Sequence, residues 1–447
     1  MTLTPNAEKL IAYLTDSGFK AYAVGGCVRD SLMKRSVNDI DLCTSAKPDE
    51  VEAILQKQKI RVVETGIKHG TVTAVIDGES YEITTFRTDG EYLDNRRPEN
   101  VSFVSDIKYD LARRDFTINA IAFNPKTGYV DLYGGMQDIE NKLIRAVGDP
   151  DKRFNEDALR IMRALRFSAV LGFDIEENTE KALFENKELL LNIAGERIYV
   201  ELVKLLLGNN CEDVLLKYRD IIAVVIPELK SCFDYPQNSK WHIYDVYTHI
   251  VKSVAVSPKK DYMRLALLFH DIGKPECKTT DENGQDHFKG HPQISAQKAY
   301  AILKRLKVSN RILKNTVALI ENHDYYITER PAVIKKWLRK LGEGLTLDYI
   351  DLKIADLATH NLVYAKPEID NLYQIRALTE GIIKRKEPYK ISDLKINGNA
   401  LFEIGFKGSE IQNELEVLIN RVSGNPDCNK EDKLIKAAIR DFEELNK

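Results

Sequence analysis

The sequence has few cysteines, no long apolar run and no excess of positive charge, and each absence argues against a class of protein. Six cysteines are scattered over 447 residues without CxxC spacing, which favours reduced thiols in the cytoplasm. No stretch approaches the roughly 20 apolar residues of a membrane span, and Met1–Pro5 lacks the basic and apolar regions of a signal peptide. The net charge of −3 argues against a protein that coats DNA, although a local basic surface could still bind RNA. We therefore expect a cytoplasmic protein without a membrane partner.

The hydrophobic pattern changes near residue 150, and a chain of this length predicts about three domains. Before that point, helical patterns over residues 5–18 and 47–58 alternate with short, often β-branched runs that predict a mixed sheet. The expected strands are Ala21–Val24, Ile40–Cys43, Arg61–Val63, Thr71–Ile76 and Tyr81–Phe86. Helical periodicity then dominates, over residues 153–187, 197–207, 212–220 and most of the chain beyond a polar boundary at Cys232–Lys240.

The most informative motif is the dipeptide Gly25–Gly26 followed by Asp39 and Asp41. Two adjacent glycines let backbone amides cradle a phosphate. Asp39 and Asp41 are one residue apart on an expected strand, so both would point the same way and could hold two divalent cations against a nucleoside triphosphate. Glu82, in another expected strand, is a third catalytic candidate. The motif predicts nucleotidyl transfer. The alternative is that these residues are ordinary surface acids. For Glu82 taken alone, the two interpretations are evenly balanced.

A second cluster comprises Arg113, Arg114, Asp115 and Asn119. Arginines suit triphosphate oxygens because the guanidinium group binds them in a bidentate manner. Asn119 could bond a sugar hydroxyl or cap a turn. Two adjacent arginines are usually only solvated, so this cluster alone is a weak signal.

A third cluster contains Asp157 and Arg160, three residues apart on an expected helix and therefore on one face of it. The carboxylate can accept the N4 amino group of cytosine, and the guanidinium group can donate to N3 and O2. Adenine also offers an amino group beside a ring-nitrogen acceptor, whereas guanine and uracil do not. The pair would therefore accept C and A. From spacing alone, a surface salt bridge worth under about 1 kcal/mol is the favoured alternative.

Taken together, these segments resemble the class II tRNA nucleotidyltransferases, the CCA-adding enzymes related to bacterial poly(A) polymerases. Residues 25–30 with 39–41 are similar to the first motif of that family, residues 113–115 to its second, and residues 156–160 to its EDxxR nucleotide-selecting motif. Residues 196–202 are similar to its neck-helix signature. The resemblance covers about residues 5–225 and implies addition of C, C and A to tRNA from CTP and ATP without a template.

The resemblance also implies residue roles and a cofactor. Asp39 and Asp41 would hold Mg²⁺. The expected nucleotide-binding residues are Gly25, Gly26, Arg29, Arg113, Arg114, Asp115, Asn119, Asp157, Arg160, Arg163 and Arg166.

Two features separate close relatives within the family. Residues 65–72 are similar to the CCA-adding type and lack the basic-aromatic segment that poly(A) polymerases of this class carry there. Residues 89–100, with Arg96 and Arg97, look like the intact flexible loop that a partial CC-adding enzyme would have lost. Full CCA addition is therefore predicted, and a poly(A) polymerase or an A-adding enzyme is the alternative.

Four of the eight histidines form a separate pattern with two aspartates. Imidazole and carboxylate ligands on helices suit a divalent transition metal such as Mn, Ni, Co or Zn. The residues are His249, His270, Asp271, His291, His323 and Asp356. The pattern resembles the H…HD…D signature of the HD phosphohydrolases, which implies that His291 and His323 are the extra ligands of binuclear members. His242, His287 and His360 have no predicted role.

The expected fold class is α+β, in which a polymerase-β-like head with a mixed sheet precedes an all-α neck, an HD domain and a helical tail. The expected domains are a head at 1–150, a nucleotide-selecting neck at 151–232, an HD domain at 240–365 and a tRNA-binding tail at 366–447. The HD domain could hydrolyse 2′,3′-cyclic or 2′-phosphate ends. A hydrolase with an RNA-binding head is the alternative from another class, and no protein partner can be inferred.

Overall fold

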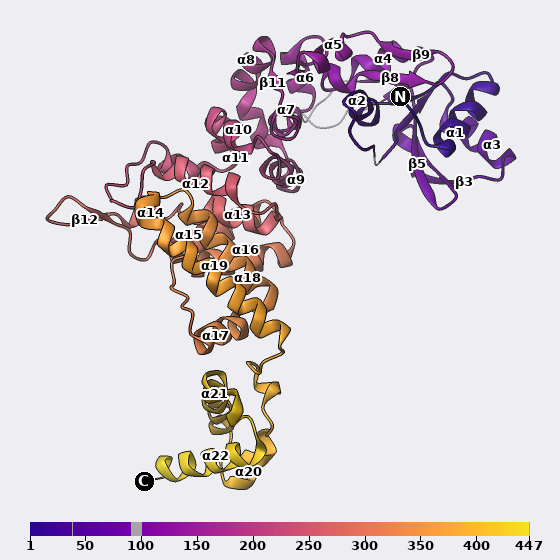
Figure 1. Cartoon of the computed structure of the whole chain (residues 1–447). Helices are drawn as coiled ribbons and strands as arrows, with labels where there is room; N and C mark the ends of the chain where they lie inside the picture. Colours follow the sequence, from indigo (N-terminus) through magenta and orange to yellow (C-terminus); the bar gives the residue numbers. More distant parts are fainter. Residues whose placement is uncertain (38, 91–100, 447) are drawn as a thin grey trace. The chain divides into compact units, whose positions relative to one another are not determined.

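The computed structural model describes residues 1–37, 39–90 and 101–446, which form two compact units, Met1–Pro227 and Glu228–Lys447 (Figure 1). The first unit begins with a seven-stranded mixed sheet in the order β3-β4-β5-β2-β1-β8-β9. Its strands are β1 (Ala21–Val24), β2 (Leu42–Thr44), β3 (Arg61–Gly66), β4 (Thr71–Ile76), β5 (Glu79–Thr85), β8 (Ile121–Asn124) and β9 (Gly128–Asp131). Strands β2 and β5 are parallel, and the other neighbours in the sheet are antiparallel.

Five short helices and two small strand pairs accompany this sheet. The helices are α1 (Pro5–Asp16), α2 (Gly26–Leu32), α3 (Pro48–Lys57), α4 (Ile107–Ala112) and α5 (Gly135–Glu140). The pairs are β6 (Arg87–Asp89) with β7 (Val101–Phe103), and β10 (Leu143–Ile144) with β11 (Asp174–Ile175).

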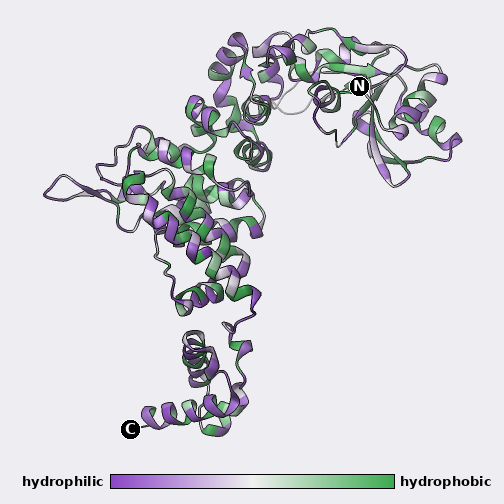
Figure 2. Ribbon diagram, viewed as in Figure 1, coloured by the Kyte–Doolittle hydropathy of each residue, from purple (hydrophilic) through white to green (hydrophobic). Residues whose placement is uncertain are grey.

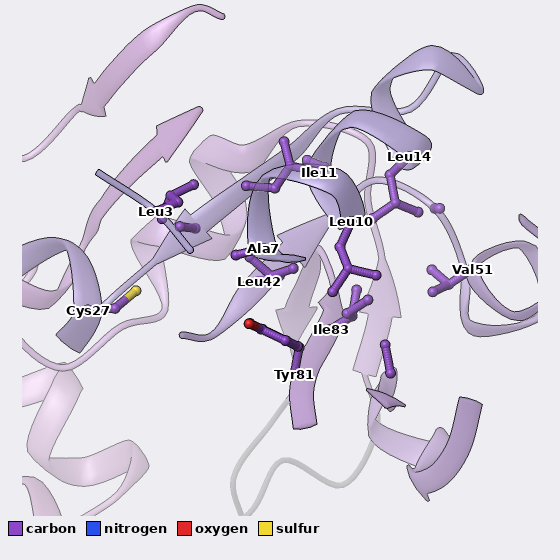
Figure 3. Packing of buried hydrophobic residues seen from close by; sticks show 14 of the residues in the cluster. Leu3, Ala7, Leu10, Ile11, Leu14, Cys27, Leu42, Val51, Tyr81 and Ile83 are labelled. Carbon is purple, nitrogen blue, oxygen red and sulfur yellow. The ribbon is translucent and has the colours of Figure 1, made fainter. Parts of the chain in front are cut away.

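The sheet buries side chains on both of its faces. Leu10 and Leu14 of α1 lie in one buried cluster with Leu42 of β2 and Ile83 of β5 (Figure 3). Cys43, the residue after Leu42, points the other way into a second cluster that includes residues of α4. This alternation is what a strand covered on both faces requires.

The rest of the first unit is mainly helical. Its helices are α6 (Pro150–Glu156), α7 (Leu159–Leu171), α8 (Glu177–Asn186), α9 (Gly195–Leu206), α10 (Cys211–Lys217) and α11 (Arg219–Val225). Helix α7 packs on α9, and ten of its residues are buried, including Arg160.

The second unit is helical apart from the pair β12 (Thr279–Thr280) and β13 (Asp286–His287). Its helices are α12 (Val246–Val256), α13 (Asp261–Phe269), α14 (Lys274–Cys277), α15 (His291–Arg305), α16 (Asn310–Asn322), α17 (Pro331–Leu341), α18 (Glu343–Leu357), α19 (Leu362–Lys384), α20 (Gly398–Ile404), α21 (Ser409–Gly424) and α22 (Glu431–Leu445). Every residue from Met263 to Phe269 is buried, and Figure 2 shows hydrophobic residues concentrated in this helical region. Residues 394–438 contribute a further small core.

The predicted α+β class with a mixed sheet and helical remainder is confirmed. One detail is wrong: Asp39 and Asp41 precede β2 and do not lie in it. The stretch of helical periodicity over 153–187 contains three helices, α6, α7 and α8. The residues on either side of the domain boundary predicted at 365/366 both belong to α19. In the loop predicted over 89–100, residues 91–100 lie outside the described part of the chain, so Arg96 and Arg97 do too. The division into four domains stays a prediction.

Two further observations bear on the composition. None of the described helices combines the length and the apolar character that a bilayer span requires. All six cysteines are free thiols.

Candidate active site and metal centre

Gly25 forms the turn between β1 and α2, and its φ of +79° is a left-handed conformation that favours glycine. A Cβ atom at this position would lie 3.0 Å from Nη1 of Arg114. The glycine therefore lets Arg114 approach the backbone. The predicted phosphate-binding dipeptide and one of the predicted arginines are thus brought together.

The three predicted catalytic carboxylates lie near one another. Asp39 and Asp41 are exposed on the segment that leads into β2, and Glu82 is exposed on β5, whose Ile83 pairs with Leu42. Although the Asp41 side chain is exposed, the protein around it keeps part of the water away from its carboxylate, which raises its pKa; the neighbouring Glu82 and Asp39 carboxylates raise it further, while Arg114 opposes them. Three acids at a solvent-facing edge are a suitable ligand set for two divalent cations.

Asp110 orients both arginines of the second motif, and no motif or spacing singled it out in the sequence. Its side chain is fully buried and accepts hydrogen bonds from Nε and Nη2 of Arg113 at 3.0 and 2.7 Å. Nη2 of Arg114 donates to its other oxygen at 3.2 Å. A lone aspartate on a short helix is common, so only the fold identifies this residue as the anchor of the pair.

Asp115, Asn119 and Arg29 form a buried polar chain. Nη1 of Arg29 donates to Oδ1 of Asn119 at 2.6 Å, and Nδ2 of Asn119 donates to Oδ1 of Asp115 at 3.0 Å. Nε and Nη2 of Arg163 donate to Oδ2 of Asp115 at 2.8 and 2.5 Å. Burial opposes the charge on Asp115, but Arg163 and Asn119 hold its pKa well below the usual value. The predicted nucleotide-binding roles of these residues stay predictions. Their observed contacts link α2 and the segment between α4 and β8 to α7.

Asp157 does not lie on a helix beside Arg160, as the spacing predicted. It ends α6 with extended backbone angles, and its carboxylate accepts from Nη2 and Nη1 of Arg197 at 3.0 and 3.4 Å. Arg197 belongs to the segment that resembles the neck-helix signature. The shared helix face is therefore a wrong prediction, because the chain breaks between α6 and α7 where Asp157 meets a partner from α9.

Arg160 is held by three acceptors. Nη1 donates to Oε2 of Glu156 at 2.8 Å and to the carbonyl of Arg153 at 3.0 Å, and Nη2 donates to the carbonyl of Arg113 at 2.8 Å. The guanidinium group has five N–H bonds. Two of them, on Nε and Nη2, have no partner among the described residues.

Nε of Arg166 forms an ion pair with Oε2 of Glu201 at a distance of 2.9 Å, and the guanidinium carbon lies 3.9 Å from the centre of the Phe167 ring. Burial lowers the pKa of Arg166 to about 10 against the opposing effect of Glu201. Arg163 and Arg166 are thus both engaged in ion pairs, and their predicted contacts with nucleotide stay predictions.

The histidine pattern of the second unit converges on one place. Nε2 of His249 lies 2.9 Å from Oδ1 of Asp356, 3.4 Å from Oδ2 of Asp271 and 3.3 Å from Nε2 of His270. Oδ1 of Asp271 faces the other way, 3.2 Å from Nε2 of His291, and that nitrogen lies 3.0 Å from Nε2 of His323. All six predicted ligands are therefore brought together, in two groups that share Asp271.

The geometry of these ligands fits divalent ions. Ligands bonded to an ion at about 2.0–2.1 Å lie about 3.0–3.4 Å apart, close to the distances observed here. Nδ1 of His270, His291 and His323 each lies 2.7 Å from a backbone carbonyl. Because a carbonyl only accepts, each Nδ1 carries the proton and each neutral Nε2 turns its lone pair inward.

The two aspartates attract positive charge to the centre of the site. Burial opposes a charge on His270, yet Asp271 and Asp356 raise its pKa to about 10. The pKa of both carboxyls lies well below the usual range despite their burial, because of the surrounding histidines and, for Asp271, Lys274. The negative charge that favours a cationic His270 would equally favour a metal ion at this position.

A cavity of about 300 Å³ opens onto this centre. Its lining includes Lys274, whose Nζ lies 2.7 Å from Oδ2 of Asp271, and the histidines His242 and His360. No role at this site was predicted for any of these three residues. Lys274 is three residues after Asp271 and His360 four residues after Asp356, spacings that place side chains together on a helix, whereas no spacing pointed to His242.

Three family models match the chain. A poly A polymerase head domain matches residues 21–145, a "probable RNA and SrmB-binding site of polymerase A" matches residues 172–233, and an HD domain matches residues 242–359.

Similar proteins of known name are CCA-adding enzymes. That of Oceanobacillus iheyensis is 37% identical over 332 residues, which cover 74% of this chain and 73% of that protein. That of Lactobacillus helveticus is 54% identical over 214 residues, 48% of this chain and 53% of that protein, so the match spans about half of that relative. The crystal structure of the Bacillus stearothermophilus CCA-adding enzyme in complex with CTP is 27% identical, covers 99% of both chains and has a TM-score of 0.74.

The shared carboxylate of Asp271 predicts how metal content responds to mutation. Asp271→Ala should lower the content by about two ions per chain, because each oxygen faces a different ligand group. His323→Ala should remove about one ion, and His287→Ala, a cavity-lining control paired with Asp281, should remove none. Metal analysis after dialysis against Mn²⁺, Ni²⁺ or Co²⁺ measures this. Equal losses for Asp271→Ala and His323→Ala would contradict the two-group arrangement.

Proposed function

Since the chain belongs to the CCA-adding enzyme family, we propose that it adds C, C and A in turn to the 3′ end of tRNA, from CTP and ATP and without a nucleic-acid template. The observation that carries this proposal is the meeting of Asp41, Glu82 and Arg114 at the Gly25 turn. Carboxylates suited to divalent ions thus lie beside a cation and a turn suited to a triphosphate, which supports the proposal.

In the proposed reaction, the 3′ hydroxyl of the RNA attacks the α-phosphorus, and pyrophosphate leaves. Asp39 and Asp41 would hold Mg²⁺, with Glu82 beside them; bound Mg²⁺ would help to deprotonate the hydroxyl and neutralise the leaving group. Arg113 and Arg114, oriented by Asp110, would bind the triphosphate oxygens. Their common anchor keeps both guanidinium groups in place before the nucleotide arrives.

The contacts of Arg160 and Asp157 support a role in choosing the base. Arg160 has two N–H bonds without a partner among the described residues. Cytosine N3 and O2 are two acceptors, so each could receive one hydrogen bond from Arg160. A carboxylate has about four lone-pair sites, so Asp157 can accept the N4 amino group while Arg197 remains bound. Glu156 and Arg197 would act as positioning residues that fix these two groups.

A primer assay tests the main proposal against its alternatives. Purified protein is given tRNA transcripts that end before CCA, before CA and before A, with single labelled nucleotides. We expect incorporation of two C and then one A. Unlimited addition of A to any RNA would identify a poly(A) polymerase, and no incorporation would favour a hydrolase whose head only binds RNA.

Asp157→Ala tests the selection of the base. The variant should accept UTP and GTP at least about tenfold more readily relative to CTP, because loss of one good hydrogen-bonded base contact costs about 1–3 kcal/mol. Its KM for CTP should change less than this ratio. The control is Glu185→Ala, an exposed acid on α8. Equal loss of activity with every nucleotide would instead make Asp157 a structural residue.

The second unit supports a further candidate activity, metal-dependent hydrolysis of 2′,3′-cyclic or 2′-phosphate ends. Its basis is the convergence of His249, His270, Asp271 and Asp356 beneath an open cavity. In hydrolysis of a cyclic phosphate, water bonds to phosphorus, one bond from phosphorus to a ribose oxygen breaks, and that oxygen takes a proton. The bound ions, of a metal such as Mn, Ni, Co or Zn, would supply an activated water and offset the negative charge of the phosphate.

Hydrolysis of 2′,3′-cyclic AMP by the protein loaded with Mn²⁺, Ni²⁺ or Co²⁺ tests this activity. We expect turnover in the wild type and its loss in Asp271→Ala, because that carboxylate serves both ligand groups. CCA addition by the same variant should be retained, since its catalytic carboxylates lie in the other unit. Absence of hydrolysis with all three metals would rule the activity out.

A further inference from the structure

His242 and His360 bring additional imidazole rings to the cavity of the second unit. Their ring centres are 4.4 Å apart, and His360 stacks on the proposed ligand His249 at 5.0 Å with an interplanar angle of 13°. Both residues line the cavity. Neither is needed for the two ligand groups around Asp271.

The backbone fixes the two histidines beside each other. The N–H of Asn361, next to His360, donates to the carbonyl of Trp241 at 2.7 Å, and the Asn361 side chain donates to the carbonyl of Lys240 at 3.2 Å. These bonds tie the end of α18 to the loop before α12. These backbone contacts therefore hold the two imidazole rings next to each other.

Ring nitrogens of both histidines are buried without partners. In the described part of the chain, Nδ1 and Nε2 of His360 and Nδ1 of His242 make no hydrogen bond. Oδ1 of Asp356 lies 3.8 Å from Nε2 of His360, too far for a hydrogen bond. Buried polar atoms without partners are uncommon, and such atoms facing a cavity indicate a ligand.

The local charge decides whether that ligand is a cation or an anion. Two divalent ions would bring four positive charges against the two carboxylates that face them, Asp271 and Asp356, and buried Lys274 adds a fifth. The loaded site then has a positive balance, which repels a third cation and attracts an anion. In either protonation state, an imidazole has at least one N–H to donate.

We propose that His242 and His360 bind the phosphoryl oxygens of the nucleotide phosphate that this cavity accepts, by donating N–H hydrogen bonds to them. The inference rests on the hydrolytic function proposed above and adds the residues that hold its substrate. The same donors bind the phosphate group of the product.

The test measures the affinity of the metal-loaded, full-length protein for inorganic phosphate by titration calorimetry. His242→Ala and His360→Ala should each weaken binding about tenfold, as expected for loss of one hydrogen bond to a charged group. His242→Gln and His360→Gln, which keep an amide donor, should recover part of the affinity. His287→Ala is the matched control from the same cavity, and it should bind as the wild type does.

Metal content and hydrolysis are measured on the same samples. Unchanged metal content with weakened phosphate binding supports the proposal. Unchanged phosphate binding overturns it, as does loss of one ion in the His242→Ala/His360→Ala double variant, which would make the pair metal ligands. Absence of phosphate binding by the wild type overturns it too. If phosphate binding depends on the pair but 2′,3′-cyclic AMP is not hydrolysed, the proposed hydrolysis fails and the anion site stands.

Discussion

The buried carboxylate of Asp115 links α7 to α2, the helix that follows the Gly25 turn, within the first unit. It accepts hydrogen bonds from Arg163 on α7 and from Asn119. Asn119 in turn accepts a hydrogen bond from Arg29 on α2. A buried charge is tolerated only when it is fully paired, and removal of one partner from such a pair typically costs about 3–5 kcal/mol. The position of α7 relative to the Gly25 turn therefore depends on this chain. The proposed phosphate site and the proposed base-selecting residues keep their relative geometry through it.

The two candidate sites hold their carboxylates in opposite ways. Asp39 and Asp41 are exposed, and partial loss of hydration and mutual repulsion act on Asp41. Asp271 is buried, and three of the four histidines near it are locked by backbone carbonyls. Exposed carboxylates suit ions that arrive with each triphosphate, whereas a buried ligand set with fixed imidazoles suits ions that remain.

Local sequence pattern predicted the strands well and the side-chain partners poorly. Ala21–Val24 and Thr71–Ile76 have the predicted bounds because apolar, mostly β-branched residues there face buried clusters on a sheet. The six residues of the histidine pattern also converge in the folded chain, and their roles as ligands stay predictions. Helical periodicity could not reveal the break at Asp157, because its partner Arg197 is 40 residues away. Asp110 and His242 gain their positions only from the folded chain, so neither composition nor spacing could single them out.

The turn at Gly25 is in contact, directly or through Asp110, with three further positions, so substitutions at these four positions should not be additive. A Cβ atom there would meet Arg114, and Arg114 cannot withdraw freely because it shares Asp110 with Arg113. Any mutational path through this turn therefore passes through intermediates that lose an ion pair or crowd the backbone. Designers who diversify this head should vary the four positions together or leave them all unchanged.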